Sequence, residues 1–384
     1  MKRFIAFTLI FFLTILTTVC SIKLFSKNSN PKNLIKKISE NESENNNVNG
    51  VWIRTIYGMD FPKTETTDSQ KKELDTIIEN CKNKNITDIF FQVVPKCDAM
   101  YKSNLNPWSE YLTGTEGKDP NYDPLDYLIK KAEKCDINIH AWINPYRVTT
   151  KNESISTLSD NNFAKNNQDA LIYSNGIPYL DPSSSKVKDH LLKIVEELAT
   201  NYPKLASIHF DDYFYPENYG DKFTDDSKEQ NNLRNVITDT IKSIHEVTSK
   251  HNIEFGVSPS GIWKNSDTDP SGSNTVGNES YYAVCADTKL WVENNYIDYI
   301  IPQLYWTSND TVSSYNVLAK WWNDLIANSG TKTKLYIGHG IYKEEVLNDI
   351  NNQLEYNKTL SNVSGSVFYA YGELMGDDKL VLNK

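Results

Sequence analysis

The stretch KLASIHFDDYFYP, residues 204–216, combines an apolar run with two adjacent carboxylates. Leu205–Phe210 predicts a buried strand, and Asp211 and Asp212 follow it directly. Packing seldom places adjacent acids at such a point, because burying a charge is costly unless the charge is paired or used. The segment therefore predicts a functional site at the end of a strand, although a solvated boundary between a strand and a loop explains the same residues.

Strand-like and helix-like patterns alternate on both sides of this segment, from Gly50 onward. The predicted strands are Val51–Tyr57, Asp88–Pro95, Ile137–Asn144, Leu205–Asp211, Ile253–Ser258, Ile297–Tyr305, Lys334–Gly338 and Ser364–Tyr371. The predicted helices are Ser69–Asn83, Pro124–Cys135, Ser184–Asn201, Asp225–His251, Tyr282–Asn294, Ser314–Ser329 and Lys343–Leu360. Eight such alternations predict an α/β fold, a single-domain (β/α)8 TIM barrel over residues 50–384. A doubly wound open sheet is the alternative, but its Gly-rich turn after the first strand is absent from the sequence.

The composition limits the class of partner. The chain has 384 residues and a net charge of −10, which argues against nucleic acid and anionic lipid, since both bind basic patches. Its 8 Trp and 23 Tyr favour carbohydrate, because aromatic rings stack on the apolar faces of sugars. A large aromatic core explains these rings equally well, and the oligomeric state stays open.

The first 49 residues predict a targeting segment and a tether. Lys2 and Arg3 precede the apolar run Phe4–Val19, so residues 1–25 read as a signal peptide or an uncleaved membrane anchor, with lipidation at Cys20 as a third alternative. Residues 26–49, rich in Asn, Lys, Ser and Glu, predict a disordered tether. Each alternative places the barrel outside the cytoplasm, secreted or anchored to the outer face of the cytoplasmic membrane by the N-terminal helix alone.

Polar residues gather at the ends of the predicted strands, where a barrel builds its active site. Among them, His209 and Asp211 share one face of their strand, while Ile208 and Phe210 share the other. The apolar pair is expected to pack against the outer helices, so Asp211 is expected to face the barrel axis. Asp212 points the other way, although strand geometry loosens at this end.

Carboxylates among aromatic rings at this end of a barrel predict glycoside hydrolysis. The reaction commonly needs two carboxyl groups, ~5 Å apart for retention and ~6.5–9.5 Å apart for inversion. Sequence neighbours make a poor pair, so a second acid is expected from another strand. The candidates, in order of preference, are Asp98, Asp60 and Glu373.

Several long motifs resemble the glycosyl-hydrolase-like family 10, a family of bacterial envelope proteins. They are GVWIRTIYGMDFP (50–62), QVVPKCDAMYKSNLNPWSEYLTGTEGKDPNYDPLDYLI (92–129), HAWINPYRV (140–148), HFDDYFYP (209–216), GVSPSGIW (256–263) and YIIPQLYW (299–306). The resemblance implies a TIM barrel, an exported or lipid-anchored protein and glycoside hydrolase activity. For some members the implied substrate is peptidoglycan glycan strands that lack stem peptides.

Matched residue by residue, the family's acidic pair falls on Asp211 and Asp212, and its strand-two Asp and Tyr fall on Asp98 and Tyr101. Its Asn-Pro-Tyr-Arg motif falls on 144–147, and its Pro-Gln-x-Tyr-Trp motif falls on 302–306. The chain departs at 94–98, where the usual Arg-Pro-x-Gly-Asp reads VPKCD. The missing Arg puts the substrate contacts near Asp98 in question.

These observations predict Asp211, Asp212 and Asp98 as catalytic residues, with no cofactor and no metal. The predicted substrate-binding residues are Gln92, Tyr101, Trp142, Asn144, Tyr146, Arg147, His209, Tyr213, Ser258, Gln303, Tyr305 and Trp306. Two routes stay open: a pair of acids, or attack by an N-acetyl group of the substrate with one Asp orienting it and the other acting as acid.

Two other functions are weighed against hydrolysis. The first is a non-catalytic glycan-binding barrel, since a fold alone does not prove chemistry. The second is a metal-dependent polysaccharide deacetylase that uses His140, His209 and His339 with Asp211, but no metal-binding spacing supports it.

Overall fold

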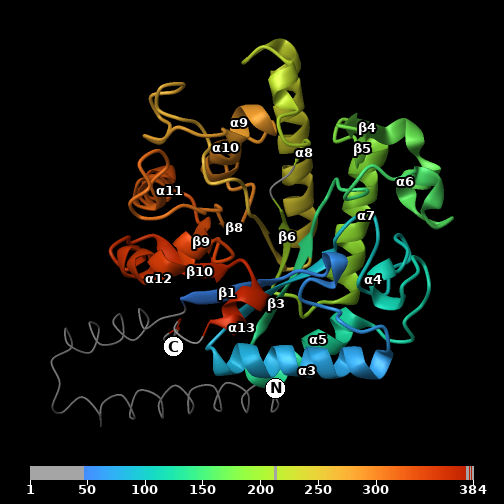
Figure 1. Ribbon diagram of the computed structural model, residues 1–384. Helices are drawn as coiled ribbons and strands as arrows, with labels where there is room; N and C mark the ends of the chain where they lie inside the picture. Colours follow the sequence, from blue (N-terminus) through green and yellow to red (C-terminus); the bar gives the residue numbers. More distant parts are fainter. Residues whose placement is uncertain (1–46, 212–213, 378–379, 381, 383–384) are drawn as a thin grey trace, which may run out of the picture. The chain divides into compact units, whose positions relative to one another are not determined.

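A closed barrel of parallel strands forms the centre of the chain, as the computed structural model shows for residues 47–211, 214–377, 380 and 382 (Figure 1). The strands adjoin in the order β1-β10-β9-β8-β7-β6-β3-β2. They are β1 (Val48–Ile53), β2 (Asp88–Val94), β3 (Asn138–Ile143), β6 (Ser207–Phe210), β7 (Glu254–Val257), β8 (Tyr299–Ile300), β9 (Lys334–His339) and β10 (Val363–Phe368). The predicted (β/α)8 barrel is therefore confirmed.

Helices follow the strands and cover the outside of the barrel, and α7 packs beside α8 (Figure 1). The longer ones are α3 (Thr67–Asn83), α5 (Pro124–Ala132), α7 (Ser185–Asn201), α8 (Lys228–Lys250), α11 (Tyr315–Ser329) and α12 (Glu344–Asn357). The shorter ones are α4 (Glu110–Thr113), α6 (Phe163–Asn166), α9 (Ser280–Ala283), α10 (Thr288–Glu293) and α13 (Tyr371–Gly376). Across the described ranges, every helix is too short or too polar to span a bilayer.

Several boundaries differ from the sequence-based prediction, and β8 is Tyr299–Ile300 where Ile297–Tyr305 was predicted. The barrel begins at Val48, whose register partner is Gly365 of β10, so two residues of the predicted tether belong to β1. Residues 1–46, which comprise the targeting segment and most of the tether, lie outside the described residues. The predicted helix Tyr282–Asn294 is divided into α9 and α10, because Cys285 adopts a left-handed φ of 54° and the Asp287 side chain caps α10.

The prediction also lacked a hairpin between β3 and α7, formed by β4 (Leu171–Ser174) and β5 (Ile177–Leu180). Figure 1 shows it beside α6, at one end of α7. Asn175 and Gly176 make its turn with φ angles of 50° and 79°, which Asn-Gly adopts at little cost. This dipeptide was the signal that could have predicted the hairpin.

The core has two parts, separated by the barrel wall. Inside the barrel, large rings such as Trp52, Phe90 and Tyr299 fill the interior. Outside it, residues such as Ile208 and Phe210 pack in the layer between strands and helices. The prediction that Ile208 and Phe210 face the helices is confirmed, and β6 consequently turns its alternate residues toward the axis.

Candidate active site

Asp211 is held by four side-chain donors at the carboxyl end of the barrel. Its Oδ2 accepts hydrogen bonds from Trp142 Nε1 at 3.1 Å and Asn144 Nδ2 at 2.9 Å. Its Oδ1 accepts from Ser258 Oγ and Gln303 Nε2, each at 3.3 Å. Both oxygens therefore face groups that come from other strands, an arrangement that suits a carboxylate, which only accepts hydrogen bonds.

The register of the barrel brings these residues together. Trp142 of β3 and His209 of β6 are direct register partners. The residues two positions further along each strand, Asn144 and Asp211, are therefore neighbours on the same axial face. The Asp211 carboxyl thus faces the axis, as the alternation along its strand predicts.

A second set of hydrogen bonds orients the Asn144 amide. Gln92 Nε2 donates to Asn144 Oδ1 at 2.6 Å, and Gln92 Oε1 accepts from the backbone N–H groups of Thr55 at 2.8 Å and Ile56 at 3.0 Å. Because the carbonyl oxygen of Asn144 faces Gln92, its NH₂ group faces Asp211. The first three strands of the barrel therefore cooperate in setting the position of one carboxylate.

His209 lies below this layer, fully buried. Its Nε2 is 2.9 Å from Ser258 Oγ and its Nδ1 is 3.1 Å from the Tyr299 hydroxyl, whose ring stacks on the imidazole. Burial holds the pKa of His209 well below its usual value, so the ring stays neutral near pH 7. His209 reaches Asp211 through Ser258, and its position is that of a support for the site.

Two pockets, each with a volume of about 200 Å³, are lined by loops that follow the strands of the barrel. The first pocket is lined by Asn144, Tyr146, Arg147, Tyr179, Phe214, Tyr215, Pro216 and Glu217. The second pocket is lined by Glu217, Ser260, Asn278, Ser280, Ala283, Val284, Gln303, Tyr305, Trp306 and Lys343. Asn144 in the first pocket and Gln303 in the second donate to opposite oxygens of Asp211, which itself lines neither pocket. The two pockets share Glu217.

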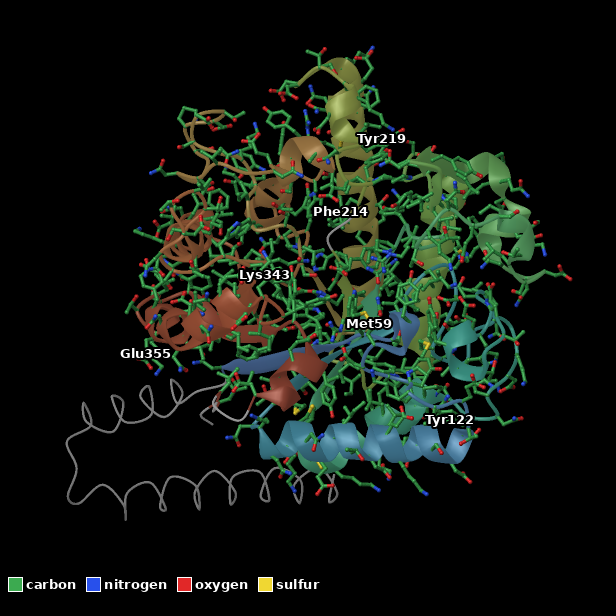
Figure 2. All side chains as sticks on the ribbon, in the orientation of Figure 1. Met59, Tyr122, Phe214, Tyr219, Lys343 and Glu355 are labelled. Carbon is green, nitrogen blue, oxygen red and sulfur yellow. The ribbon has the colours of Figure 1, made fainter. Side chains whose placement is uncertain are left out.

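The two pockets are assembled from loops that follow different strands. Figure 2 shows Phe214, from the loop after β6, and Lys343, from the loop after β9, in the central part of the view. Tyr122 and Glu355, which line neither pocket, lie nearer its margin. Tyr179 belongs to the hairpin β4–β5, so an element that the sequence did not predict supplies part of the first pocket.

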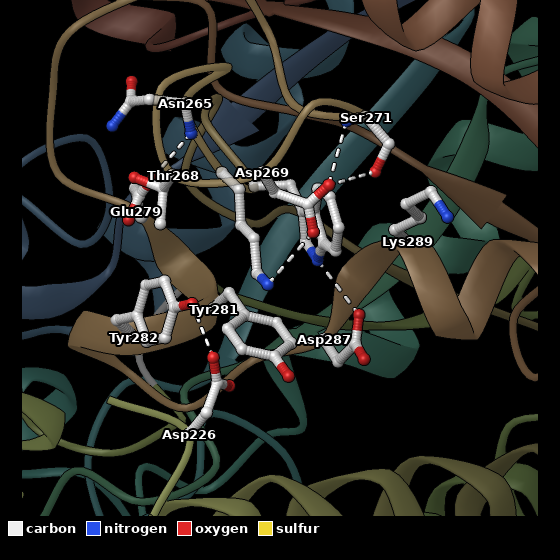
Figure 3. A network of polar contacts seen from close by, with 12 residues as sticks. Asp226, Asn265, Thr268, Asp269, Ser271, Glu279, Tyr281, Tyr282, Asp287 and Lys289 are labelled. Carbon is white, nitrogen blue, oxygen red and sulfur yellow. Dashed lines mark hydrogen bonds and ion pairs between the residues drawn. The ribbon is translucent and has the colours of Figure 1, made fainter. Parts of the chain in front are cut away.

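A polar network holds the long loop between β7 and α10, which forms one wall of the second pocket (Figure 3). The Tyr282 hydroxyl donates to Asp226 at 3.1 Å, and the Asp287 carboxyl accepts from Trp263 Nε1 at 2.9 Å. Within the loop, Asp269 accepts from both the backbone and the hydroxyl of Ser271. These bonds tie the loop to itself and to the segment before α8.

Two cations enclose the ring of Tyr281 in the same network. Arg234 Cζ and Lys264 Nζ each lie 3.9 Å from the ring centroid. Arg234 belongs to α8, and it also donates to the Tyr281 backbone carbonyl and to Asp226. The outer helix therefore fixes the loop that carries Ser280, a lining residue of the second pocket.

Asp98, predicted as the second catalytic acid, lies in a buried loop after β2. Its side chain is fully buried, Oδ1 accepts from the Lys96 backbone N–H at 3.1 Å, and Oδ2 has no hydrogen-bond partner in the part of the chain that the structure describes. Burial raises the pKa of Asp98 to about 7, against the opposing charge of Lys96. Neither pocket has Asp98 among its lining residues.

The other acids considered from the sequence have structural partners. Asp60 accepts from both Arg54 Nε at 2.8 Å and Arg54 Nη2 at 2.9 Å, and Glu373 forms an ion pair with Arg54 at 2.8 Å. Tyr101 is fully buried, and its hydroxyl donates to Glu197 of α7 at 3.3 Å. The structure therefore places Asp60, Glu373 and Tyr101 in contacts that join parts of the fold.

The structure assembles a large part of the predicted set around Asp211. Tyr146, Arg147, Tyr305 and Trp306 line the pockets, whereas Gln92 and Trp142 lie buried beneath them. Asp212 and Tyr213 lie outside the described residues. The lining residues that the sequence did not single out include Glu217, Tyr179 and Lys343. Glu217 was within reach of prediction, because it lies in the loop that follows the acidic pair.

Comparisons with known proteins agree with this architecture. Residues 47–358 match the family model described as glycosyl hydrolase-like 10. The chain is 32% identical over 366 residues to glycosyl hydrolase YngK of Bacillus subtilis, covering 87% of this chain and 70% of the relative. It is 33% identical over 370 residues to glycosyl hydrolase DigH of Escherichia coli K12, covering 84% and 82%. A solved β-galactosidase from the psychrophilic Marinomonas ef1 is similar in fold alone, with a TM-score of 0.50 and 8% identity over 84% of this chain and 54% of that one.

Proposed function

Because the chain belongs to the glycosyl hydrolase-like 10 family and is a glycoside hydrolase, we propose that its substrate is the glycan of the bacterial cell wall, in particular peptidoglycan strands that lack stem peptides. The observation that supports this proposal is that Asp211, at the carboxyl end of the barrel, accepts hydrogen bonds from one lining residue of each pocket, Asn144 and Gln303. A chain bound through both pockets would contact both of these residues. A polymer is therefore a better fit than a single sugar.

Asp211 acts at the anomeric carbon of the sugar whose bond is cleaved. Its four donors hold it as an oriented acceptor, which suits either of two roles. In one role, Asp211 either stabilises the positive charge that develops at the anomeric carbon or attacks that carbon directly. In the other, Asp211 orients the substrate's acetamido group, whose carbonyl oxygen attacks the carbon while a second carboxyl acts as acid.

The pocket walls supply the binding surfaces. Tyr146 and Tyr179 line the first pocket, and Tyr305 and Trp306 line the second. Aromatic rings of this kind stack on the apolar faces of sugars, and Arg147 offers donors to hydroxyl and carbonyl groups. The net charge of −10 fits a neutral or sparsely charged glycan better than a polyanion.

The test uses the purified protein and peptide-free glycan strands, with the products analysed by mass. We expect wild type to shorten the strands, and Asp211→Asn to lower kcat/KM by about 10²–10⁴-fold. Asp221→Asn, which changes an exposed acid that lines neither pocket, is the matched control and should retain activity. Intact strands after incubation with wild type, or undiminished cleavage by an Asp211→Asn, Asp212→Asn double variant, would refute the proposal.

We further propose that the enzyme works outside the cytoplasm, secreted or anchored to the outer face of the cytoplasmic membrane. The support is the signal-like segment at residues 1–25, which carries Lys2 and Arg3 ahead of an apolar run. If the protein is anchored, protease added to intact protoplasts should digest it. If the protein is secreted, it should be found in the culture medium. Complete protection inside intact cells would contradict this location.

A further inference from the structure

Glu217 stands where the two pockets meet. It follows Asp211 by six positions in the loop after β6, its side chain is exposed, and it lines both pockets. Tyr179, another lining residue of the first pocket, has its pKa raised by burial and by the charge of Glu217 and lowered by Arg147. Glu217, Arg147 and Tyr179 therefore all line the first pocket, where the charges of Glu217 and Arg147 act on Tyr179.

The other acids near the site are engaged or enclosed. Asp60 and Glu373 are paired with Arg54, and Glu110 is paired with Lys96. Among the residues that line the two pockets, Glu217 is the sole acid, and the structure gives it no hydrogen bond or ion pair within the described ranges. A carboxyl in this position is accessible to both a bound sugar and solvent.

We propose that Glu217 is the general acid–base that works with Asp211. A glycan that occupies both pockets must cross their junction, so its glycosidic oxygen passes beside the Glu217 carboxyl. The inference deepens the proposed function, since it assigns the second carboxyl of the same site. It also replaces the sequence-based preference for Asp98, whose side chain is fully buried.

The reaction balances with this assignment. Protonated Glu217 donates its proton to the glycosidic oxygen as the bond from that oxygen to the anomeric carbon breaks, and the first sugar leaves as an alcohol. The anomeric carbon is meanwhile attacked by Asp211 or by the acetamido oxygen. Water then attacks that carbon and transfers a proton to the Glu217 carboxylate, which restores both the acid and Asp211. One water is consumed, and two sugar ends with free hydroxyls form.

The test compares leaving groups of different acidity. A general acid contributes more to the rate when the leaving group is a weaker acid, because such a group needs a proton to depart. Wild type and Glu217→Gln are assayed on glycan strands and on aryl glycosides of the shortest chain that wild type cleaves, with phenols of graded acidity. We expect kcat/KM on glycan to fall about 10²–10⁴-fold, but less than about tenfold on the dinitrophenyl glycoside. The Tm of the variant should stay unchanged.

The controls separate the alternatives. Asp221→Asn, in the same loop, should behave as wild type on all substrates. Wild-type activity in Glu217→Gln, or an equal loss on all leaving groups, would overturn the assignment. If Asp212→Asn shows the dependence on leaving group instead, Asp212 is the acid. Failure of wild type on peptidoglycan strands would refute the proposed substrate alone. The role of Glu217 is then decided with graded aryl glycosides of another neutral or N-acetylated oligosaccharide that wild type cleaves.

Discussion

At the scale of single residues, Asp98 shows how burial changes the chemistry of a carboxyl. The fully buried side chain has a pKa raised to about 7, whereas an Asp in the unfolded chain titrates near 4. Between these values, the folded protein holds one proton more than the unfolded chain. The contribution of Asp98 to the free energy of unfolding therefore falls as the pH rises from about 4 to about 7.

Asp98→Asn should remove this pH dependence, because the amide does not ionise. Relative to wild type, we expect the free energy of unfolding of the variant to rise between about pH 4 and pH 7, by about 2–4 kcal/mol in total. Urea unfolding of both proteins at several pH values measures the difference. A constant difference across this range would contradict the proton uptake that the buried position implies.

Also at this scale, the sequence predicted the direction of Asp211 but not its environment. Alternation along β6 was sufficient to turn Asp211 toward the axis. Its four donors come from the ends of β3, β7 and β8, which are separated from it by up to 92 positions. No local pattern contains such distances, so the roles of Trp142 and Ser258 as supports of the carboxyl emerged from the fold.

At the scale of elements, the loop between β7 and α10 depends on a cation supplied by α8. Arg234 is 3% exposed, binds the Tyr281 ring and carbonyl, and forms an ion pair with Asp226 at 3.1 Å. The sequence predicted α8 but showed only its apolar stripe. A polar residue on a helix has no evident partner until the loop that folds over it is known.

Arg234→Ala should therefore affect the second pocket as well as stability. We expect a loss of about 2–4 kcal/mol in the free energy of unfolding, because the variant leaves the partner groups of Arg234 unpaired. We also expect a higher KM for glycan at a nearly unchanged kcat. Chemical denaturation and steady-state kinetics measure the two effects, and Arg234→Lys should restore little of either, since Lys lacks the planar fork.

The matched control is Lys250→Ala, an exposed cation at the opposite end of α8. It should leave both stability and KM unchanged. If Arg234→Ala destabilises the protein but leaves KM at the wild-type value, the loop between β7 and α10 does not depend on α8 for its shape. Such a result would contradict the role of Arg234 in holding the wall of the second pocket.

At the scale of the whole molecule, the three histidines that suggested a metal site are each occupied by other bonds. His140 and His209 lie on the adjacent strands β3 and β6, and His339 lies on β9. His140 contacts Ser207 Oγ at 2.6 Å and Asp88 Oδ1 at 2.9 Å through its two ring nitrogens. His339 likewise contacts Gln353 Oε1 at 2.8 Å and Ser366 Oγ at 3.0 Å. A metal ion would have to displace these partners as well as those of His209.

We therefore expect activity on glycan to be the same after dialysis against EDTA. Added Zn²⁺ or Mg²⁺ should not increase it, as hydrolysis by carboxyl groups needs neither ion. The measurement is kcat/KM before and after chelation, with a known zinc hydrolase treated in parallel. Loss of activity that Zn²⁺ restores would show that the metal-dependent alternative is correct.

What the sequence determined by itself was the barrel and the location of its active face. Both follow from local chemistry: alternation of apolar residues sets the strands, and acids or aromatic residues at the strand ends mark the functional side. The tertiary structure decided which carboxyls can meet a substrate. It enclosed Asp98, paired Asp60 with Arg54 and left Glu217 at the junction of two pockets. The physical reason is that accessibility and pairing depend on segments far apart in the chain, which only closure of the barrel brings together.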